Sequence, residues 1–350
     1  MASLRAAAFA LLLAGCADPG PGGAFDTYLQ RLARPLETAA VERRTPTVAP
    51  PPRSAKLRLP LAPGRLDALD FLELRGCQLQ VTVGKRNSSL GRLAAPSQEL
   101  LLELEFLRLA PACIRHLENN AESALADTLR EALASKREEL PARIYNATLA
   151  SEEFRDLWQA PQALNDYPES TSSAPIAALE TVNGLASRWL AGDYAADNRD
   201  FELLLSEVTR GDAGALLAAL KMQHAALQAA NSMLQSRLQR GPLCRGPLVP
   251  EQVDILKNVV EKFFIRGIQP WSASLRRREH ALLPQIRQLE QQLAAVLPPR
   301  YRQWKTRREA LLTSATDAPR RHVEQIQSLL ADCRQAKSTS PLAPAQPTSE

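Results

Sequence analysis

Residues 274–297, SLRRREHALLPQIRQLEQQLAAVL, decide the fold class of this chain. Their main apolar residues recur at alternating spacings of four and three: Leu282, Ile286, Leu289, Leu293 and Val296. This is the spacing of a coiled-coil seam, in which one stripe of a helix packs against a partner helix. Because the seam is short and ends at Pro298-Pro299, it favours an antiparallel bundle pair over an oligomeric zipper.

Residues 212–240 predict a second long helix, with leucines seven residues apart and an end at Gly241-Pro242. The helical period continues almost everywhere after residue 65, and several helix starts carry an N-cap residue or a first-turn proline. The predicted starts are Pro96, Asn120, Ser151, Pro175, Asp200, Asp212, Pro250, Trp271, Pro299 and Asp317. Strand patterns occur only at residues 58–61 and 78–83. We therefore expect an all-α antiparallel helical bundle with two long helices.

The helical domain is expected over residues 65–336, as one body or as two subdomains of about 65–195 and 196–336. Residues 16–64 form a tether in this interpretation, apart from a short amphipathic piece at 25–32. Seven prolines between residues 34 and 64 exclude helix there. They leave two alternatives open: a semi-rigid spacer, or an extended strap lying across the body. Residues 337–350 have the composition of a disordered tail.

The first residues have the layout of an export signal. Arg5 precedes an apolar run, residues 6–15, which is too short to be a transmembrane helix. The motif Leu13-Ala14-Gly15-Cys16 resembles the bacterial lipobox, in which the cysteine carries diacylglycerol and its amine a further acyl chain such as palmitate. We expect residues 1–15 to be a lipoprotein signal peptide and Cys16 to be lipidated. The alternative is an ordinary secretory signal with a chance cysteine.

This interpretation predicts a protein attached to the membrane by lipid in the cell envelope and facing the periplasm. Ala17 favours the outer membrane over the inner, although Asp18 weakens that preference. The chain has 350 residues and is 45% hydrophobic, so it can bury a substantial core. Its net charge of +5 is small for this length, and the compartment argues against nucleic acid as a partner.

Without Cys16, four cysteines remain: Cys77, Cys113, Cys244 and Cys333. Disulfides persist in an oxidising compartment, and an even number of cysteines allows all to pair. Of the three possible connectivities we favour the one in which each bridge stays within one half of the chain, Cys77 with Cys113 and Cys244 with Cys333. Buried free thiols are the alternative. The cysteines lack the spacing of zinc ligands, so we expect no metal.

Catalytic and cofactor motifs are absent from the sequence. It contains no GxSxG elbow, no HExxH, no Walker loop and no Rossmann glycine run, and its four histidines stand singly. We therefore expect no cofactor and no catalytic residue. A lone histidine on a helix is usually a surface or satisfied core residue.

Two polar segments are candidate ligand sites. In the first, Arg86, Asn87 and Ser88 would bind an anionic head group or sugar, or Ser88 would act as a nucleophile, although no base is identifiable. The alternative is a turn with Gly91 at positive φ. The second is basic with aromatics, comprising Arg276, Arg277, Arg278 and residues 300–308. It would bind an anionic polymer or membrane, or be a solvated helix face.

The chain also resembles a lipoprotein family of Gram-negative bacteria, domain of unknown function 3080. Five segments carry the resemblance: residues 69–79 (LDFLELRGCQL), 86–91 (RNSSLG), 104–107 (LEFL), 110–113 (APAC) and 269–271 (QPW). The resemblance implies an envelope lipoprotein and supplies no activity, ligand or partner.

These observations favour a lipid-anchored envelope lipoprotein that is not an enzyme and binds or scaffolds an envelope component. That component is another protein, an anionic glycan or a lipid. Two alternatives stay open. One is an envelope hydrolase with a site near Ser88 that lacks a motif, and the other is a carrier of an apolar ligand between the long helices.

Overall fold

The computed structural model describes residues 20–45, 49–61, 74–245 and 249–333. Every regular element in these ranges is helical, which confirms the all-α expectation. The helices of the first half are α1 (Gly20–Leu36), α2 (Ser54–Leu57), α4 (Leu79–Asn87), α5 (Ser89–Arg92), α6 (Pro96–Asn119), α7 (Ser123–Ala147), α8 (Glu152–Leu157) and α9 (Ala174–Leu190). Those of the second half are α10 (Asn198–Thr209), α11 (Ala213–Gln239), α12 (Glu251–Val259), α13 (Gln269–Gln292), α14 (Pro299–Thr316) and α15 (Ala318–Leu329).

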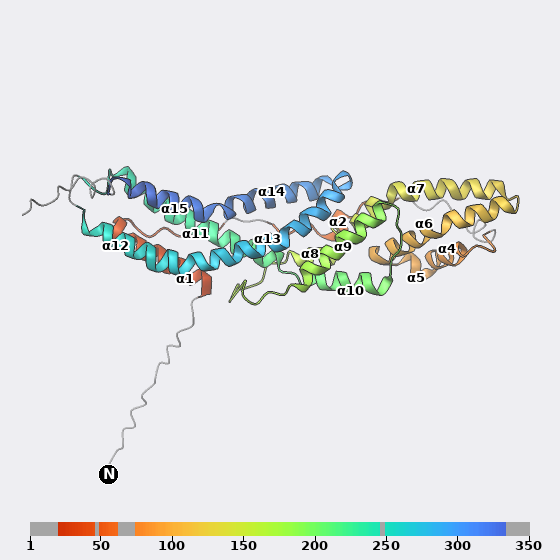
Figure 1. Cartoon of the computed structure of the whole chain (residues 1–350), viewed down its shortest axis with the longest axis horizontal. Helices are drawn as coiled ribbons and strands as arrows, with labels where there is room; N and C mark the ends of the chain where they lie inside the picture. The colour runs from red at the N-terminus through yellow and green to blue at the C-terminus, as the bar shows by residue number, and fades with distance from the viewer. Residues whose placement is uncertain (1–19, 46–48, 62–73, 246–248, 334–350) are drawn as a thin grey trace, which may run out of the picture.

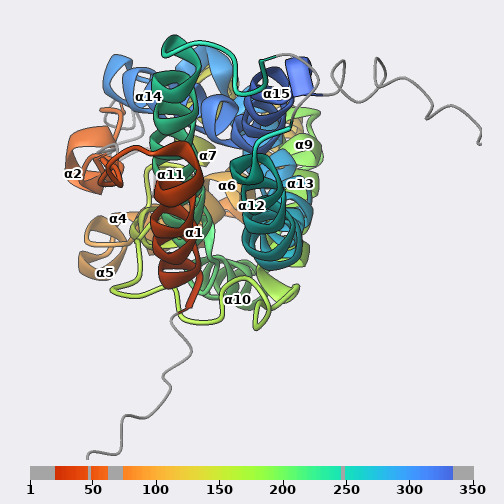
Figure 2. The same ribbon diagram turned by 90° about the vertical axis from the view of Figure 1, so that its left-hand side faces the viewer.

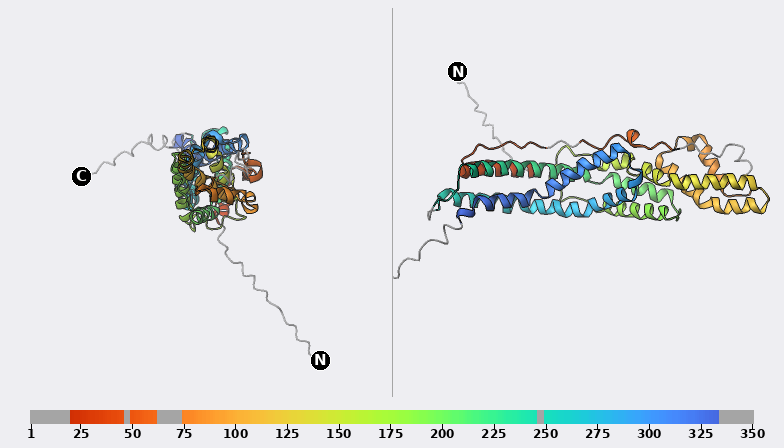
Figure 3. Two further views of the ribbon diagram at one scale, coloured as in Figure 1. Left: turned by 90° about the vertical axis from the view of Figure 1, so that its right-hand side faces the viewer. Right: turned by 90° about the horizontal axis from the view of Figure 1, so that it is seen from above.

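The molecule is a long helical rod, compact in the end-on view and extended from above (Figure 3). One end is the antiparallel pair α6 and α7, and the other end contains α1, α11, α12 and α15 (Figure 1). The two predicted long helices are α11 and α13, and α13 is continued by a short 3₁₀ turn, Ala294–Val296. No helix in the described ranges is long and apolar enough to cross a membrane.

Two hydrophobic cores hold the rod together. The first core contains residues of α4, α6, α7, α9, α10, the first half of α11, α13 and α14. The second contains α1, the second half of α11, α12 and α15. Helix α11 changes from the first core at Leu220 to the second at Ala226, and Trp271 packs against both. The cores therefore do not follow a division of the chain near residue 195, because α13 and α14 return to the first core.

Helix α1 lies inside the segment expected to be a tether. The amphipathic piece predicted over residues 25–32 extends to Gly20–Leu36, and Phe25, Tyr28 and Leu32 are almost fully buried in the second core. Each of these side chains removes a large apolar area from water, which outweighs the cost of ordering the glycines that precede them. Residues 20–36 are therefore a helix packed on the body and not a tether.

Residues 49–61 lie across the body, as the strap alternative expected, although Ser54–Leu57 form the short helix α2 and so correct the prediction that the prolines exclude helix there. Leu57 is buried in the first core, and the backbone N–H of Leu59 donates to Asn146 Oδ1 at 2.8 Å. Asn146 Nδ2 donates in return to the carbonyl of Leu59 at 3.0 Å. This side-chain amide satisfies both backbone groups as a neighbouring strand would. Residues 58–61 therefore have an extended backbone without being part of a sheet.

The prediction of a strand over residues 78–83 is wrong, because these residues form the start of helix α4. Their alternating sequence, QLQVTV, has the period of a strand. The residues that are buried, however, are Leu79, Thr82 and Val83, which lie on one face of a helix. The packing of this segment against α6 favours a helix and outweighs its local preference for a strand.

Both predicted disulfides are present, which confirms the favoured pairing. Cys77 and Cys113 join the turn before α4 to α6, with a Cα–Cα distance of 5.3 Å. Cys244 and Cys333 join the segments after α11 and α15, with a Cα–Cα distance of 5.1 Å. Each bridge closes a different core. Residues 1–19 and 334–350, which contain Cys16, the predicted signal and the predicted tail, lie outside the described residues.

Candidate functional site: a tryptophan-walled cleft beneath the strap

Ser88 is a helix cap. Its side chain accepts a hydrogen bond from the Gly91 backbone N–H at 3.0 Å, and its hydroxyl donates to the Lys85 carbonyl at 2.7 Å. A Cβ at Gly91 would lie 2.2 Å from the Lys85 carbonyl oxygen, so only glycine fits this turn. The turn alternative is correct for Ser88, whose hydroxyl is bonded to its own backbone, but Gly91 lies in helix α5 and does not have the expected positive φ.

Arg86 points away from Ser88 and pairs with Glu103. The Arg86 guanidinium lies 3.0 Å from the Glu103 carboxylate, which is almost fully buried and is also bonded to Lys136. Burial lowers the pKa of Lys136, although the charge of Glu103 opposes that shift. Asn87 is exposed. The structure thus does not bring Arg86, Asn87 and Ser88 together at one site.

The three arginines of the second segment have three different environments. Arg278 is buried, and its Nε donates to Asp212 Oδ2 at 2.9 Å. Arg277 donates to Ser274 Oγ at 2.8 Å. Arg276 is exposed and lines a cleft of about 480 Å³ between α11, α13 and the start of α15. Of the three, Arg276 alone lines that cleft.

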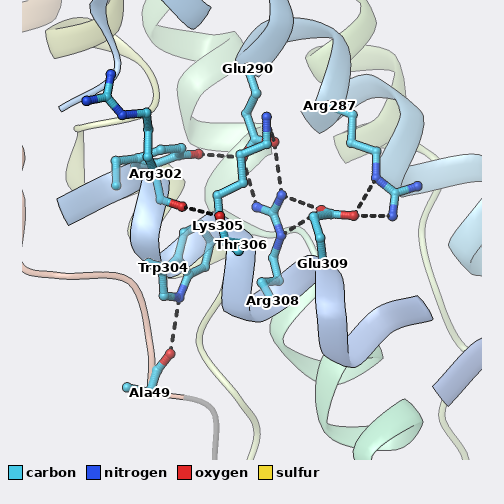
Figure 4. Close-up of polar contacts among 10 residues, drawn as sticks. Ala49, Arg287, Glu290, Arg302, Trp304, Lys305, Thr306, Arg308 and Glu309 are labelled. Carbon is cyan, nitrogen blue, oxygen red and sulfur yellow. Dashed lines mark hydrogen bonds and ion pairs between the residues drawn. The ribbon is translucent and has the colours of Figure 1, made fainter. Parts of the chain in front are cut away.

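Arg308 lies at the centre of a buried charge network (Figure 4). The sequence had predicted a surface position for this residue. Its guanidinium donates two hydrogen bonds to the Glu290 carboxylate, at 2.8 and 2.9 Å, and another to Glu309 Oε1. Tyr301 donates to Glu290 Oε1 at 2.8 Å. Arg287 in turn donates to Glu309 Oε2 at 2.7 Å. The paired geometry is the strong form of charge-assisted hydrogen bond.

The electrostatics of this network keep its groups in fixed protonation states. Burial alone lowers the pKa of Arg308, but the hydrogen bonds and charge of Glu290 outweigh it and raise that pKa above its usual value. Burial raises the pKa of Tyr301, and the nearby Glu290 raises it further. Burial alone raises the pKa of Glu309, but hydrogen bonds from Arg287 and the charge of Arg308 lower it below the usual value. These shifts of pKa keep Arg308 and Glu309 charged and Tyr301 neutral at neutral pH.

Two indole rings contact the Arg308 guanidinium. Its carbon Cζ lies 4.7 Å from the ring centroid of Trp158 and 4.8 Å from that of Trp304. The two rings meet edge to face, with centroids 5.2 Å apart. Cation–π contacts of this kind strengthen when they are desolvated. Helix α14 and the residue after α8 therefore present two indoles in one fixed orientation.

The indoles form one wall of a cleft of about 330 Å³, which we call the strap cleft. Its other walls come from the strap at residues 49–51, from Gln159 and from α11, which contributes Leu217 and Lys221. The Trp304 indole N–H donates to the Ala49 carbonyl at 3.1 Å and so fastens the strap to the wall (Figure 4). The volume is in the range of small-ligand sites.

Two cationic side chains, Arg155 and Lys221, and one carboxylate, Asp156, line the strap cleft, which leaves an excess of one positive charge. The Arg155 guanidinium lies 3.7 Å or more from its acidic neighbours Glu152 and Asp156, and its buried Nε has no hydrogen-bond partner among the described residues. The rest of the guanidinium is only loosely paired, so it can bind the acceptor of a ligand. The cleft therefore places two cationic side chains beside a wall that contains two largely buried indoles, 5% and 6% exposed.

Local sequence explains how these residues reach the cleft. Ser151 caps α8 by accepting from the Phe154 N–H, and the helix ends at Leu157, directly before Trp158. Helix α11 approaches this turn closely because Gly214 has no side chain, and a Cβ there would lie 2.2 Å from the Gln159 carbonyl oxygen. Sequence reasoning missed the site because its residues come from four distant segments. The available signals were Trp158 and Trp304.

Metal binding has no support in the described residues. No group of three or more His, Cys, Asp or Glu side chains there is arranged to hold an ion.

A search of curated proteins and a search of solved structures found no match to the chain. A family model described as Protein of unknown function (DUF3080) matches residues 25–336 and therefore covers most of the chain. The chain belongs to this family, as the segments that resemble it predicted.

Proposed function

We propose that the protein is an envelope lipoprotein, anchored through an acylated Cys16, which binds an anionic glycan in the strap cleft. Its role is to bind or scaffold rather than to catalyse. The outer membrane is the proposed location, with the helical body facing the periplasm. The lipobox at residues 13–16 supports the anchor, and the two disulfides support an oxidising compartment.

The architecture of the strap cleft carries the ligand proposal. Trp158 and Trp304 both contact Arg308 and are 5% and 6% exposed, so the entropy cost of ordering the parts of these indoles that line the cleft is met during folding. Sugar rings have apolar faces that stack on indoles. Arg155 and Lys221 supply the charge that recognises a carboxylate or phosphate. This combination suits an anionic carbohydrate better than a neutral apolar molecule.

The hydrolase alternative lacks a specific observation in its favour, since the Ser88 hydroxyl is used as a cap. We therefore propose a binding protein rather than a hydrolase.

The anchor is tested by intact mass of the chain purified from a bacterial envelope. We expect cleavage before Cys16 and the added mass of acyl chains on that residue, whereas the Cys16→Ala chain carries neither. An unmodified native chain with residues 1–15 still present would contradict the anchor.

The ligand site is tested by tryptophan fluorescence during titration with muropeptides, which are soluble anionic fragments of peptidoglycan. We expect a saturable change, because the indoles of Trp158 and Trp304 line the cleft. Arg155→Gln/Lys221→Gln should bind about tenfold or more weakly, since two charge pairs are lost. Arg276→Gln, in the other cleft, is the matched control and should bind normally. Equal affinity for all three chains would refute the site.

A further inference from the structure

Three large apolar side chains near α4 and α5 are exposed. Leu90 is 85% exposed, Leu93 is 86% exposed and Val81 is 62% exposed. Leu90 lies in α5 and Leu93 directly after it, so two leucines project from one short turn. Burying such side chains is favourable, and a group of them on one surface is typical of an interaction site.

The charge of this segment is entirely positive. Residues 74–95 contain Arg75, Lys85, Arg86 and Arg92 and no acidic residue. Arg86 is neutralised by the buried Glu103, and Lys85 lies 3.6 Å from Glu105 on α6. Arg75 and Arg92 are exposed. Leucines flanked by cations are suited to a surface that is apolar inside and anionic outside, which is the composition of an anionic bilayer.

The position of α1 limits how far this surface can lie from the membrane, if Cys16 is anchored as proposed. Helix α1 begins at Gly20, and its buried residues Phe25 and Tyr28 fix it in the second core. Four peptide units separate Cys16 from Gly20, so an extended chain places Gly20 within roughly 14 Å of the acylated residue. The body therefore cannot stand far from the bilayer.

The same side of the rod carries the start of α1 and the exposed leucines. Figures 1 and 2 both place the first turn of α1, α5 and α10 on the lower side, with α7, α14 and α15 on the upper side. Helix α10 adds Leu203, which is 57% exposed. A rod that rests on this lower side brings α5 to the lipid surface reached by the anchor.

We infer that the turn formed by α4 and α5 is a second membrane contact, at which Leu90 and Leu93 insert among anionic lipid head groups with Arg75, Lys85 and Arg92 beside them. This inference rests on the proposed lipid anchor for its orientation. The Cys77–Cys113 disulfide supports it mechanically, because it ties the start of α4 to α6 and so keeps the turn in place. The rod then lies along the membrane rather than extending into the periplasm.

The test uses the full chain with Cys16→Ser, which cannot be acylated, so that binding does not depend on the anchor. The chain is sedimented with vesicles of phosphatidylglycerol and phosphatidylethanolamine, and with phosphatidylcholine vesicles for comparison. We expect about tenfold tighter binding to the anionic vesicles. Leu90→Asn/Leu93→Asn should weaken that binding about tenfold, because the inserted side chains are lost. Lys85→Gln/Arg92→Gln should remove most of the preference for anionic lipid.

The matched control is Leu190→Asn/Leu238→Asn, which changes two leucines of 37% and 39% exposure in α9 and α11. It should bind vesicles as its parent does. Circular dichroism and intact disulfides confirm that each variant is folded. Unchanged vesicle binding of the Leu90/Leu93 variant would overturn the inference, as would a change in its oligomeric state alone, which would assign the surface to a second copy. The intact mass of the native chain tests the anchor separately.

Discussion

His322 forms a buried polar chain with residues of two other helices. Tyr28 in α1 and His322 Nε2 in α15 are hydrogen-bonded at 2.7 Å, and His322 Nδ1 lies 2.6 Å from Asn231 Oδ1 in α11. Phe264 packs edge-on against the imidazole, with ring centroids 4.7 Å apart. A neutral imidazole that donates from Nδ1 and accepts at Nε2 satisfies every partner. The lone histidine is therefore a satisfied core residue, as the sequence favoured.

This environment predicts a loss of stability in acid. Burial lowers the pKa of His322 to about 3, below its usual 6.5. The unfolded chain therefore takes up a proton that the folded chain refuses, and stability falls as the pH drops from 6.5 towards 3. The expected loss is about 3 kcal/mol between pH 7 and pH 4. Urea unfolding at each pH measures it.

His322→Gln is the control for that effect, because glutamine keeps a donor and an acceptor without titrating. Its stability at pH 7 should be lower than that of the native chain, but its decrease between pH 7 and pH 4 should be smaller by most of the predicted amount. An identical pH dependence in the two chains would show that His322 is not responsible.

The Glu290–Arg308 pair predicts a second effect at the residue scale. Both side chains are almost completely buried, so Arg308→Leu leaves the Glu290 carboxylate without its main partner. Breaking such a pair costs about 3–5 kcal/mol. The double variant Glu290→Leu/Arg308→Leu should recover much of that loss. Arg302→Ala, an exposed change in α14, should cost little. Urea unfolding compares the four chains, and equal losses for Arg308→Leu and Arg302→Ala would contradict the buried pair.

At the scale of elements, helix boundaries were predictable where capping is local. Ser151 directly precedes α8 and caps it, as its side chain predicts. Asp212 also directly precedes α11, but its carboxylate makes no cap hydrogen bond and accepts from Arg278 and Tyr167 instead. The junction of α12 and α13 was not predictable. A π-helix over Val260–Ile268 joins them into a continuous helix, and the Gln269 N–H donates to the Phe264 carbonyl across its wider turn. Pro270 follows and has no N–H to donate. The sequence predicted a new helix starting at Trp271, but the packing of this region instead continues one helix through a π-helical turn.

The strap predicts a change in protease sensitivity. Asn146 makes two hydrogen bonds to the backbone of Leu59, and Asn146→Ala removes both. The strap should then open more often, so that trypsin cleaves faster after Lys56 and Arg58. Two lost hydrogen bonds of about 1 kcal/mol each predict roughly tenfold faster cleavage or more. Asn87→Ala changes an exposed asparagine and serves as the control. Cleavage at an unchanged rate would mean that other contacts hold the strap.

At the scale of the whole molecule, the two disulfides secure opposite ends of the rod. The Cys244–Cys333 bridge closes the second core, and the Cys77–Cys113 bridge lies in the first. Cys244→Ala/Cys333→Ala should lower stability by about 2–4 kcal/mol. Hydrogen exchange should quicken in α1, α12 and α15, while α6 and α7 stay protected. Equal acceleration in both cores would show that α11 couples them into one unit.

The sequence by itself determined the helical class, most helix starts and the disulfide pairing. Those features follow from local spacing, from capping residues and from the preference for pairing cysteines within the same half of the chain. Tertiary structure alone decided that residues 78–83 are helical, that residues 49–61 lie on the body and that Arg308 is buried against Trp158 and Trp304. The physical reason is the same in each case. Burial depends on which distant segments meet, and the alternation of QLQVTV or the basic run of α14 has the same local pattern in either environment.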